Sequence, residues 1–196
     1  MEGLTWAETD ATDCEAAVLL EGVSDVAAVR AIAARLGADL SRVRLVDLGG
    51  VTNVRRVLLD ILQAWPDADV LGLCDAGETR FVTRALESAG LGVAQERDLP
   101  SHGFFVCHAD LEEELIRALG AARTVEIIED LGLGPKFLTL QQQPAWKGRP
   151  VEDQLHRFCG VASGRKELLA GALAAQLAPG EVPEPLRLLV ERLIQA

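Results

Sequence analysis

The chain has no tyrosine and few aromatic residues of any kind, which make up 4% of its 196 residues. Hydrophobic residues still account for 49%, so we expect a core of leucine, valine, isoleucine and alanine. No apolar run reaches the roughly 18 residues that cross a membrane, and the acidic N-terminus has no apolar signal segment. We therefore expect a cytoplasmic protein without a membrane partner, formed by one domain or by one domain with a small extension.

Cysteine is also scarce, and its spacing argues against both a disulfide framework and a zinc site. Cys14, Cys74, Cys107 and Cys159 lie far apart, and none of them belongs to a CxxC pair. Two of them, Cys74 and Cys107, fall within apolar runs that we interpret as strands. Buried, reduced thiols are therefore the expected state of these two residues.

Basic residues are outnumbered, with 19 Lys and Arg against 30 Asp and Glu, for a net charge of −11. This balance argues against a broad electrostatic footprint on nucleic acid, although it leaves room for a local basic strip. Solubility is the simplest explanation of most of the negative charge. The tail after about residue 121 carries much of the positive charge, including Lys136, Lys147, Arg149, Arg157, Arg165 and Lys166.

Four short apolar runs alternate with amphipathic helical segments in the first 120 residues. The runs predict strands at 16–20, 43–48, 69–74 and 103–107, and a helix follows each. Such alternation predicts an α/β fold, with a mostly parallel four-stranded sheet flanked by helices. We place a flexible lead-in at 1–13, the α/β core at 14–120, and a helical C-terminal extension that carries the basic residues at 121–196.

Finer features follow from caps and breakers. Ser24 is a plausible N-cap of the first helix, and Gly37 a good stop for it. Gly49-Gly50 is most simply a turn, although its backbone amides could also serve a phosphate. In the extension we expect helices near 125–131, 151–159 and 165–177 and a short last helix, with a loop or an irregular helix end at 137–146.

Acidic residues follow three of the predicted strands at their carboxyl ends. These acids are Glu21 and Asp25, then Asp75 and Glu78, and finally Asp110 with Glu112. Because the carboxyl ends of parallel strands meet at one edge of a sheet, where ligands bind, we expect the acids to lie close together. Only a cation would neutralise such crowding, and hard cations such as Mg²⁺ prefer carboxylate oxygens. The alternative for each acid after a strand is a helix cap, or a favourable contact with a helix N-terminus.

The order of these motifs resembles the Toprim domain, which is shared by type IA and type II topoisomerases, bacterial primases and nucleases of the overcoming-lysogenization-defect (OLD) family. The resemblance is closest to the OLD type, and the span 14–189 is similar to stand-alone Toprim proteins of actinobacteria. The motifs that carry it are EGVSD after a buried strand, a second strand that ends in GG, the acidic turn DAGE, the segment DLEEEL, and the helix SGRKELLAGALA.

The resemblance implies a role for each matching residue. Glu21 matches the strand-one catalytic Glu, which would act in metal binding or proton transfer, and Lys166 matches the basic residue near the scissile phosphate. The positions that match metal-binding acids are Asp25, Asp75 and Glu112. The chain departs from the family at the second Asp of D-x-D, where Gly77 stands, and Glu78 follows one residue later. Glu78 either reaches the same metal with its longer side chain, or one metal site is weakened or lost.

The expected function is hydrolysis of phosphodiester bonds in nucleic acid, as an OLD-like DNA endonuclease that uses one or two Mg²⁺ or Mn²⁺ ions. Two such ions can activate water and stabilise the leaving oxygen. Lys147, Arg149 and Arg165 are the candidate nucleic-acid contacts. The alternative is a non-catalytic or regulatory Toprim module that binds metal or nucleotide, or that serves as effector subunit of a separate ATPase.

The absence of a P-loop motif from this chain motivates the idea of an ATPase on another chain. The oligomeric state is left open, with a homodimer among the alternatives. A receiver-like or phosphatase-like domain also places Asp at strand ends. It is disfavoured because such folds need a Lys at a later strand end, whereas Lys166 belongs to a helix far down the chain.

Overall fold

The structure, a computed structural model, describes residues 14–92, 95–161 and 163–195, and the lead-in expected at 1–13 lies outside them. Its centre is a four-stranded sheet in the order β2-β1-β3-β4, and all three strand pairs are parallel. The strands are β1 (Ala16–Leu20), β2 (Val43–Asp47), β3 (Asp69–Asp75) and β4 (Phe104–Cys107). The predicted parallel α/β sheet is thereby confirmed.

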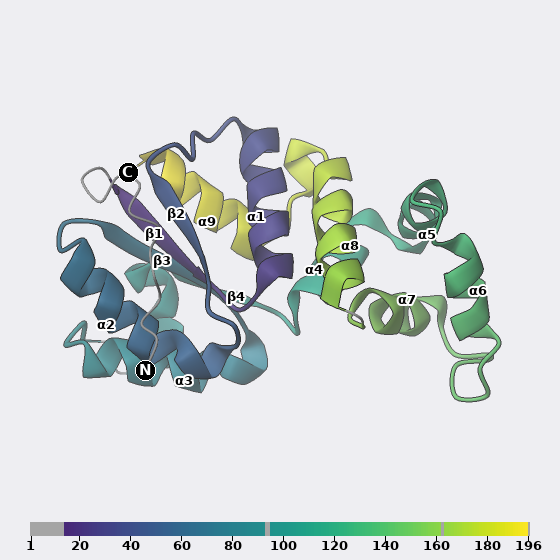
Figure 1. Ribbon diagram of the computed structural model, residues 1–196, viewed down its shortest axis with the longest axis horizontal. Helices are drawn as coiled ribbons and strands as arrows, with labels where there is room; N and C mark the ends of the chain where they lie inside the picture. Colours follow the sequence, from purple (N-terminus) through teal and green to yellow (C-terminus); the bar gives the residue numbers. More distant parts are fainter. Residues whose placement is uncertain (1–13, 93–94, 162, 196) are drawn as a thin grey trace.

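Helices cover both faces of this sheet and extend beyond it in one direction (Figure 1). The α-helices are α1 (Val23–Leu36), α2 (Val54–Ala64), α3 (Thr79–Ser88), α4 (Leu111–Leu119), α5 (Ala121–Asp130), α6 (Gly134–Gln141), α7 (Val151–Cys159), α8 (Ser163–Gln176) and α9 (Glu184–Gln195). Short 3₁₀ segments are η1 (Val51–Asn53), η2 (Ala76–Glu78), η3 (Glu96–His102) and η4 (Pro179–Glu181). None of the helices in the described part of the chain is long and apolar enough to cross a membrane.

The central strand β1 divides the molecule into two hydrophobic cores. Its side chains alternate, because successive residues of a strand point to opposite faces of the sheet. Ala17 and Leu19 pack with residues of α2 and α3. Ala16, Val18 and Leu20 pack with residues of α1, α8 and α9. Every residue of β1 is therefore buried, and the continuous apolar run AAVLL follows from this double coverage.

The second face of the sheet is covered by helices from distant parts of the sequence. Helix α8 lies alongside α1, as Figure 1 shows, and α9 packs against β3 and β4. The approach of α8 to α1 is close at Gly171, where an added Cβ would lie 3.4 Å from the Cβ of Ala27. Helices α5, α6 and α7 form a lobe beside the sheet. The C-terminal segment thus both builds this lobe and returns to the sheet.

Most predicted elements agree with the structure, and three differ. Helix α1 begins at Val23, with Gly22 as its N-cap, so Ser24 is not the cap. Residues 134–141 form α6, whereas a loop or irregular end was expected from 137 onward; Pro135 at its first turn favours the helix start. The last helix has 12 residues and is not short. Gly37 ends α1 in the left-handed conformation, as predicted.

The cysteines are free thiols, and Cys74 and Cys107 are buried as expected. Packing requires a glycine in β3, the strand that contains Cys74. A Cβ on Gly72 of β3 would approach the Phe104 ring to 2.5 Å, so the aromatic side chain of β4 occupies the space above this glycine. This contact keeps β3 and β4 in register beside the acidic end of β3.

Candidate metal centre

Three carboxylates meet at the carboxyl edge of the sheet. Glu21 follows β1, Asp75 is the last residue of β3, and Glu78 ends the short helix η2 that continues β3. One carboxylate oxygen from each lies within 4.8 Å of the others. We call Glu21, Asp75 and Glu78 the acidic triad. The parallel pairing of β1 with β3 produces it, because both strands end at the same edge.

The turn after β2 supports the first member of the triad. The Gly50 amide donates a hydrogen bond of 2.9 Å to the backbone carbonyl of Glu21. The Gly49 amide donates one of 2.7 Å to Asp47 Oδ1. Gly50 has a φ of 111°, a conformation that glycine adopts without strain. Both glycine amides are thus engaged within the protein, and that of Gly50 helps to position Glu21.

Asp25 lies beside the triad and is buried, with 8% of its surface exposed. Its Oδ2 accepts hydrogen bonds from the Gly22 amide at 3.1 Å and the Ser24 hydroxyl at 3.3 Å. It therefore closes the first turn of α1, as the helix-terminus interpretation of this acid requires. Burial, and then the negative charge of Glu21, raise the pKa of Asp25 to about 6. The residue thus contributes both to the helix start and to the negative potential of the site.

The triad is electrostatically strained as it stands. Burial and the charge of Glu21 raise the pKa of Asp75 to about 8 and that of Glu78 to about 7. Both groups therefore resist ionisation near neutral pH. In addition, Glu78 Oε2 is buried without a hydrogen-bond partner among the described residues. An all-carboxylate donor set with an unsatisfied oxygen and mutual repulsion fits a hard divalent cation such as Mg²⁺ or Mn²⁺.

Lys166 approaches the same edge from α8, where it pairs with the predicted metal ligand Glu112. Lys166 Nζ lies 3.4 Å from Glu112 Oε1, and the Glu112 carboxylate is buried at the start of α4. Burial disfavours the charge of Lys166, but the surrounding carboxylates, first Glu112 and then Asp25 and Glu21, raise its pKa. Burial raises the pKa of Glu112 despite this lysine. The structure thus places Lys166 as a cation beside the triad and Glu112 against it.

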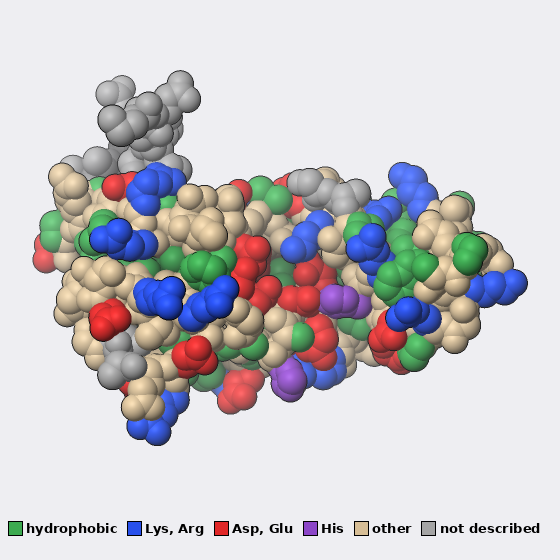
Figure 2. Space-filling view, turned by 90° about the horizontal axis from the view of Figure 1, so that it is seen from below, with side chains coloured by type: hydrophobic (Ala, Val, Ile, Leu, Met, Phe, Trp, Pro, Cys, Tyr) green, Lys and Arg blue, Asp and Glu red, His purple; other side chains and the backbone are tan. Residues whose placement is uncertain are grey.

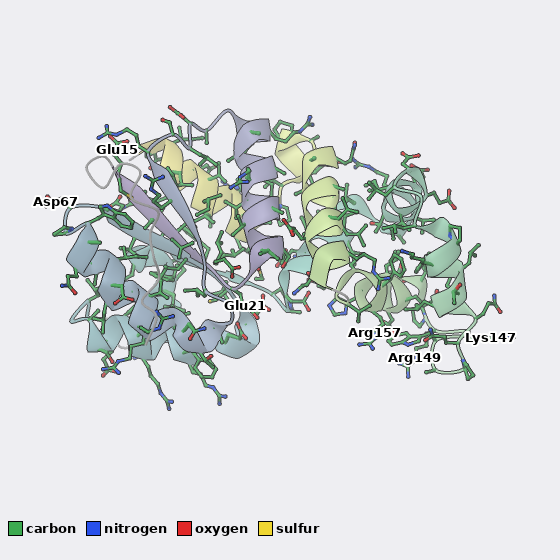
Figure 3. The ribbon with its side chains drawn as sticks, viewed as in Figure 1. Glu15, Glu21, Asp67, Lys147, Arg149 and Arg157 are labelled. Atoms are coloured by element: carbon green, nitrogen blue, oxygen red, sulfur yellow. The ribbon has the colours of Figure 1, made fainter. Side chains whose placement is uncertain are left out.

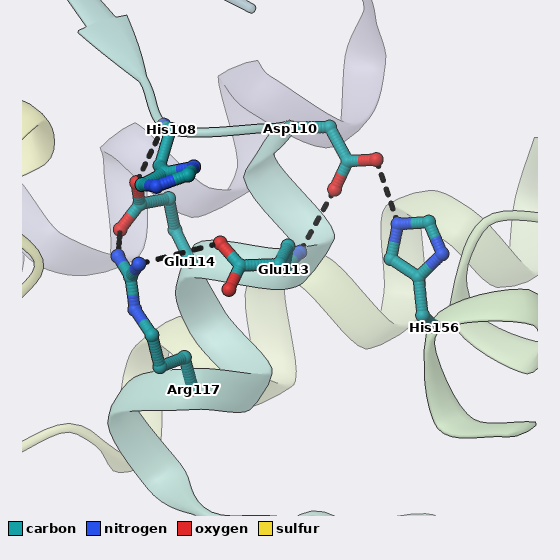
Figure 4. Close-up of polar contacts among 6 residues, drawn as sticks. All are labelled: His108, Asp110, Glu113, Glu114, Arg117 and His156. Carbon is teal, nitrogen blue, oxygen red and sulfur yellow. Dashed lines mark hydrogen bonds and ion pairs between the residues drawn. The ribbon is translucent and has the colours of Figure 1, made fainter. Parts of the chain in front are cut away.

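A second feature of the edge, the contact between Asp110 and His156, joins α4 to α7 (Figure 4). Asp110 is the N-cap of α4, and its Oδ1 accepts a hydrogen bond of 2.8 Å from the Glu113 amide. Its Oδ2 lies 2.7 Å from His156 Nε2. No local signal in the sequence could join two residues 46 positions apart. Asp110 carried a signal, as part of the acidic segment after β4.

The buried acid Glu114 anchors the same helix start from the other side. One of its oxygens accepts a hydrogen bond of 2.8 Å from the His108 amide, and the other pairs with Arg117 one turn later. Figure 4 shows these contacts beside the Asp110–His156 contact. The Asp110 and Glu114 side chains thus both fix the first turn of α4. These contacts give Asp110 and Glu112 a defined position at the sheet edge.

The three candidate nucleic-acid contacts lie outside the triad. Lys147 and Arg149 are exposed on the turn between α6 and α7, where the Arg149 guanidinium lies 5.2 Å from the centre of the Trp146 ring. Figure 3 shows both residues, with Arg157, along the lower margin of the lobe. The Arg165 guanidinium lies 4.2 Å from the Phe158 ring centre, next to Lys166 on α8. In Figure 2, acidic side chains gather in the middle of this face and basic ones lie to either side.

The surface between these groups is hollowed. A cavity of about 260 Å³ is lined by Glu21, Asp75, Asp110, Glu112, Trp146, His156, Arg157, Gly160, Val161 and Lys166. Glu21 and Asp75 of the triad, Lys166 of α8, and Arg157 of α7 therefore face the same cavity. Of the site residues predicted from sequence, Glu21, Asp75, Glu112 and Lys166 line this cavity, whereas Asp25, Glu78, Lys147, Arg149 and Arg165 do not.

A parallel sheet with an acidic carboxyl edge, completed by a lysine-bearing helix, defines this domain as OLD-like Toprim in fold, and solved structures show the same fold. The C-terminal region of the OLD protein of Xanthomonas campestris pv. campestris matches with a TM-score of 0.70, at 23% identity over 93% of each chain. That of the Burkholderia pseudomallei OLD protein matches with a TM-score of 0.68, at 16% identity over 93% of this chain and 98% of its own. Neither a family model nor a curated protein matches the sequence.

Proposed function

We propose that the chain is a divalent-metal-dependent phosphodiesterase, a DNA endonuclease of OLD-like Toprim type. The observation that carries this proposal is the acidic triad, with carboxylate oxygens within 4.8 Å of one another, beside the Lys166–Glu112 pair in one cavity. Hydrolysis of a phosphodiester needs charge stabilisation of its transition state and positioning of water more than covalent participation of the protein. The acids and the lysine together offer both.

The triad would hold Mg²⁺ or Mn²⁺ through Glu21, Asp75 and Glu78, with Asp25 adding negative charge behind them. A bound ion of this kind lowers the pKa of coordinated water and neutralises charge on phosphate oxygens. Glu21 lines the cavity and is positioned by the Gly50 amide, so it is suited to accept a proton there. Lys166 also lines it, with 37% of its side chain exposed, and would contact the phosphate.

Glu112 has two roles open to it within this proposal. As a ligand it would add a fourth carboxylate, as the family resemblance implies. As the partner of Lys166, it already holds the ammonium group at the cavity wall. Because the Glu112 carboxylate is buried, this pairing would hold the Lys166 ammonium group in one place. If the carboxylate lay between Lys166 and the metal ion, Glu112 would fill both roles at once.

The basic side chains around the cavity support a polyanionic substrate despite the net charge of −11. Arg157 lines the cavity, and Lys147 and Arg149 lie farther along the same margin of the lobe (Figure 3). Phosphate contacts of this kind position a nucleic acid on either side of a reacting bond. The negative charge elsewhere would restrict binding to these side chains, and their contacts with phosphates would make the affinity strongly dependent on salt.

The test is cleavage of supercoiled and linear DNA by the purified chain with Mg²⁺ or Mn²⁺. We expect nicked or linear product with the wild type, and loss of at least about a hundredfold in rate for Glu21→Gln and Asp75→Asn. Asp67→Asn is the matched control, because Asp67 is exposed at the opposite end of the sheet from Glu21 (Figure 3). A wild-type chain that binds metal but cleaves neither DNA would overturn the proposal.

A second candidate is a non-catalytic Toprim module that works with a separate ATPase. Gly77 favours it, because this residue stands where the resemblance implies a second Asp, and the next acid, Glu78, comes one residue later. Calorimetric titration with Mg²⁺ or Mn²⁺ separates the two candidates. One weak site, abolished by Asp75→Ala and accompanied by no hydrolysis, is the expected result for the module.

A further inference from the structure

A second, larger hollow continues from the cavity of the acidic triad into the lobe. Its volume is about 680 Å³, and it lies between α4 and α7. Both hollows are lined by Asp110, Trp146 and His156, so these three residues form their common wall. A volume of this size lies within the range of pockets that enclose small organic ligands. The proposed nuclease reaction leaves this second hollow without a role.

The wall at Trp146 has the chemistry of a stacking platform. The Arg149 guanidinium lies 5.2 Å from the centre of the Trp146 ring, and that of Arg157 lies 6.0 Å from it. Trp146 is half-buried, so part of the indole remains accessible to a ligand. Indole rings and guanidinium planes are the protein groups on which unpaired nucleobases stack.

A buried amide holds this platform in place. Gln154 on α7 is 6% exposed, and its side-chain nitrogen donates hydrogen bonds to the carbonyls of Trp146 and Arg149, at 2.9 and 3.2 Å. Its oxygen accepts a bond of 2.8 Å from the Gln141 side chain. The Arg149 Nε further donates to the Ala145 carbonyl at 2.8 Å. The turn that carries Trp146 is therefore preorganised, which lowers the entropic cost of binding.

The charged side chains that line the larger hollow favour binding of a nucleobase over binding of a phosphate. Glu113, Glu152 and Asp153 line it together with Arg149 and Arg117, and Arg117 is already paired with Glu113 and Glu114. Carboxylates repel a phosphate, but they accept hydrogen bonds from the amino and imino groups of a base. The apolar part of the wall is supplied by residues such as Ile116. The hollow is thus suited to the uncharged, hydrogen-bonding edge and the flat face of a nucleobase.

We propose that the hollow between α4 and α7 is a nucleobase subsite, in which an unpaired base next to the scissile phosphate stacks on Trp146. This inference rests on the proposed function, and it narrows the substrate class to nucleic acid with an unpaired nucleotide beside the cleaved bond: a single strand, a flap or a frayed end. A base within a duplex has both faces stacked and cannot enter the hollow unless it is extruded.

The test compares binding of a short fluorescein-labelled single-stranded oligonucleotide with binding of the same sequence as a blunt duplex. Binding is measured by anisotropy in Ca²⁺, and a gel verifies that the probe stays intact. We expect Trp146→Ala to weaken single-strand binding about tenfold, because stacking on an aromatic side chain contributes ~1–3 kcal/mol per base. Trp146→Phe should retain most of the affinity, and duplex binding should change less than about twofold in both variants.

A control variant and a fluorescence measurement separate loss of the subsite from misfolding of a variant. Leu138→Ala is the matched control, because Leu138 is exposed on α6 outside the hollow. Saturating oligonucleotide should also quench the tryptophan fluorescence of the wild type, and Trp146→Phe should lack this quenching although the other two tryptophans remain. The Phe variant thereby reports on the subsite even if Trp146→Ala does not fold.

The results separate this inference from the proposed function. Unchanged single-strand affinity in Trp146→Ala, or an equal loss for duplex and single strand, would overturn the nucleobase subsite even if the chain cleaves DNA. Selective loss of single-strand binding would support the subsite even if no metal promotes cleavage, and in that case the proposed nuclease activity would be the part that fails.

Discussion

Lys166 Nζ lies 3.4 Å from Glu112 Oε1, so this ion pair joins α8 to the start of α4 at the edge of the acidic triad. The Glu112 carboxylate is buried, whereas the lysine is partly exposed to the cavity. The pair therefore presents a positive charge to the cavity while its negative partner stays in the wall. The ion pair fixes the position of both side chains. Because the lysine is the more exposed of the two, substitution of Lys166 should affect contact with the substrate more directly than substitution of Glu112.

Lys166→Met should abolish the proposed cleavage while leaving metal binding in place. The loss should be about 10²–10³-fold in rate, the usual effect of removing one charge that stabilises the transition state. The variant should also unfold at a lower temperature, because it leaves the buried Glu112 carboxylate without its partner. Cleavage assays, calorimetry with Mn²⁺ and thermal unfolding check these three expectations. Lys136→Met, which removes an exposed lysine of α6, should match the wild type in all three.

Gly77→Asp should be accommodated and would place an acid at the position where the Toprim domains that the sequence resembles have their second Asp. Nothing lies within 4 Å of a Cβ added to Gly77, so the substitution meets no steric obstacle. If Glu78 fills the place of the missing Asp, Glu78→Ala should weaken Mn²⁺ binding about tenfold, and Gly77→Asp should rescue that variant. Gly77→Asn, of the same size without the charge, is the control. Equal rescue by Asn would show that the added carboxylate is not a ligand.

Gly50→Ala should destabilise the protein and displace Glu21. Its φ of 111° is strained for any residue with a Cβ, at a cost of about 1–3 kcal/mol. Because the Gly50 amide bonds to the Glu21 carbonyl, relief of the strain would move the first member of the triad. Urea unfolding and Mn²⁺ affinity should both report this change. Gly77→Ala, at an unstrained and open position, should alter stability little.

The sheet and most of its helices were predictable because their signals are local. The run AAVLL specifies β1 through burial on both faces, and Gly37 ends α1 by its left-handed conformation. The triad was predictable as well, since parallel strands carry Glu21 and Asp75 to the same edge. The resemblance to OLD-type Toprim domains then agreed with the solved structures in fold.

Contacts between distant segments were not predictable in the same way. The Asp110–His156 contact and the Lys166–Glu112 pair depend on how α7 and α8 return to the sheet, and no periodicity encodes that path. Helix α6 was expected in part as a loop because the run of glutamines at 141–143, at and beyond its end, masks the apolar residues Phe137 and Leu140, which are buried. The bond from the Gly22 amide to Asp25 at the start of α1, where Ser24 was expected as the N-cap, depends on side-chain geometry that sequence alone does not determine.

Stability should depend on pH most strongly when no metal is bound. The pKa values of Asp25, Glu78 and Asp75 are raised to about 6, 7 and 8, from ordinary values of 3.8, 4.5 and 3.8. A group whose pKa is raised by folding stabilises the folded state below its unfolded pKa, and this contribution is lost as the pH rises through the folded value. In EDTA, the unfolding temperature should therefore fall between about pH 5 and pH 9.

A variant without Asp75 and the wild type with Mn²⁺ should both differ from the metal-free wild type in how the unfolding temperature varies with pH. Asp75→Asn removes the group with the highest of these pKa values, so its unfolding temperature should vary less over the same range. Mn²⁺ should stabilise the wild type more at the alkaline end, because protons compete with metal for the same oxygens. A metal-free wild type that becomes more stable from about pH 5 to pH 9 would contradict the expected strain within the triad.

The packing of α8 against α1 has a consequence for synthesis of the chain. The triad and Glu112 belong to the first 112 residues and leave the ribosome early, whereas Lys166 and the helices that cover one sheet face follow much later. Until α8 and α9 pack against the sheet, one face of strands β1 and β3 stays partly uncovered. The acidic residues also lack the positive charge of Lys166 until then. The complete site is therefore a product of the finished fold, and a partly made chain cannot display it.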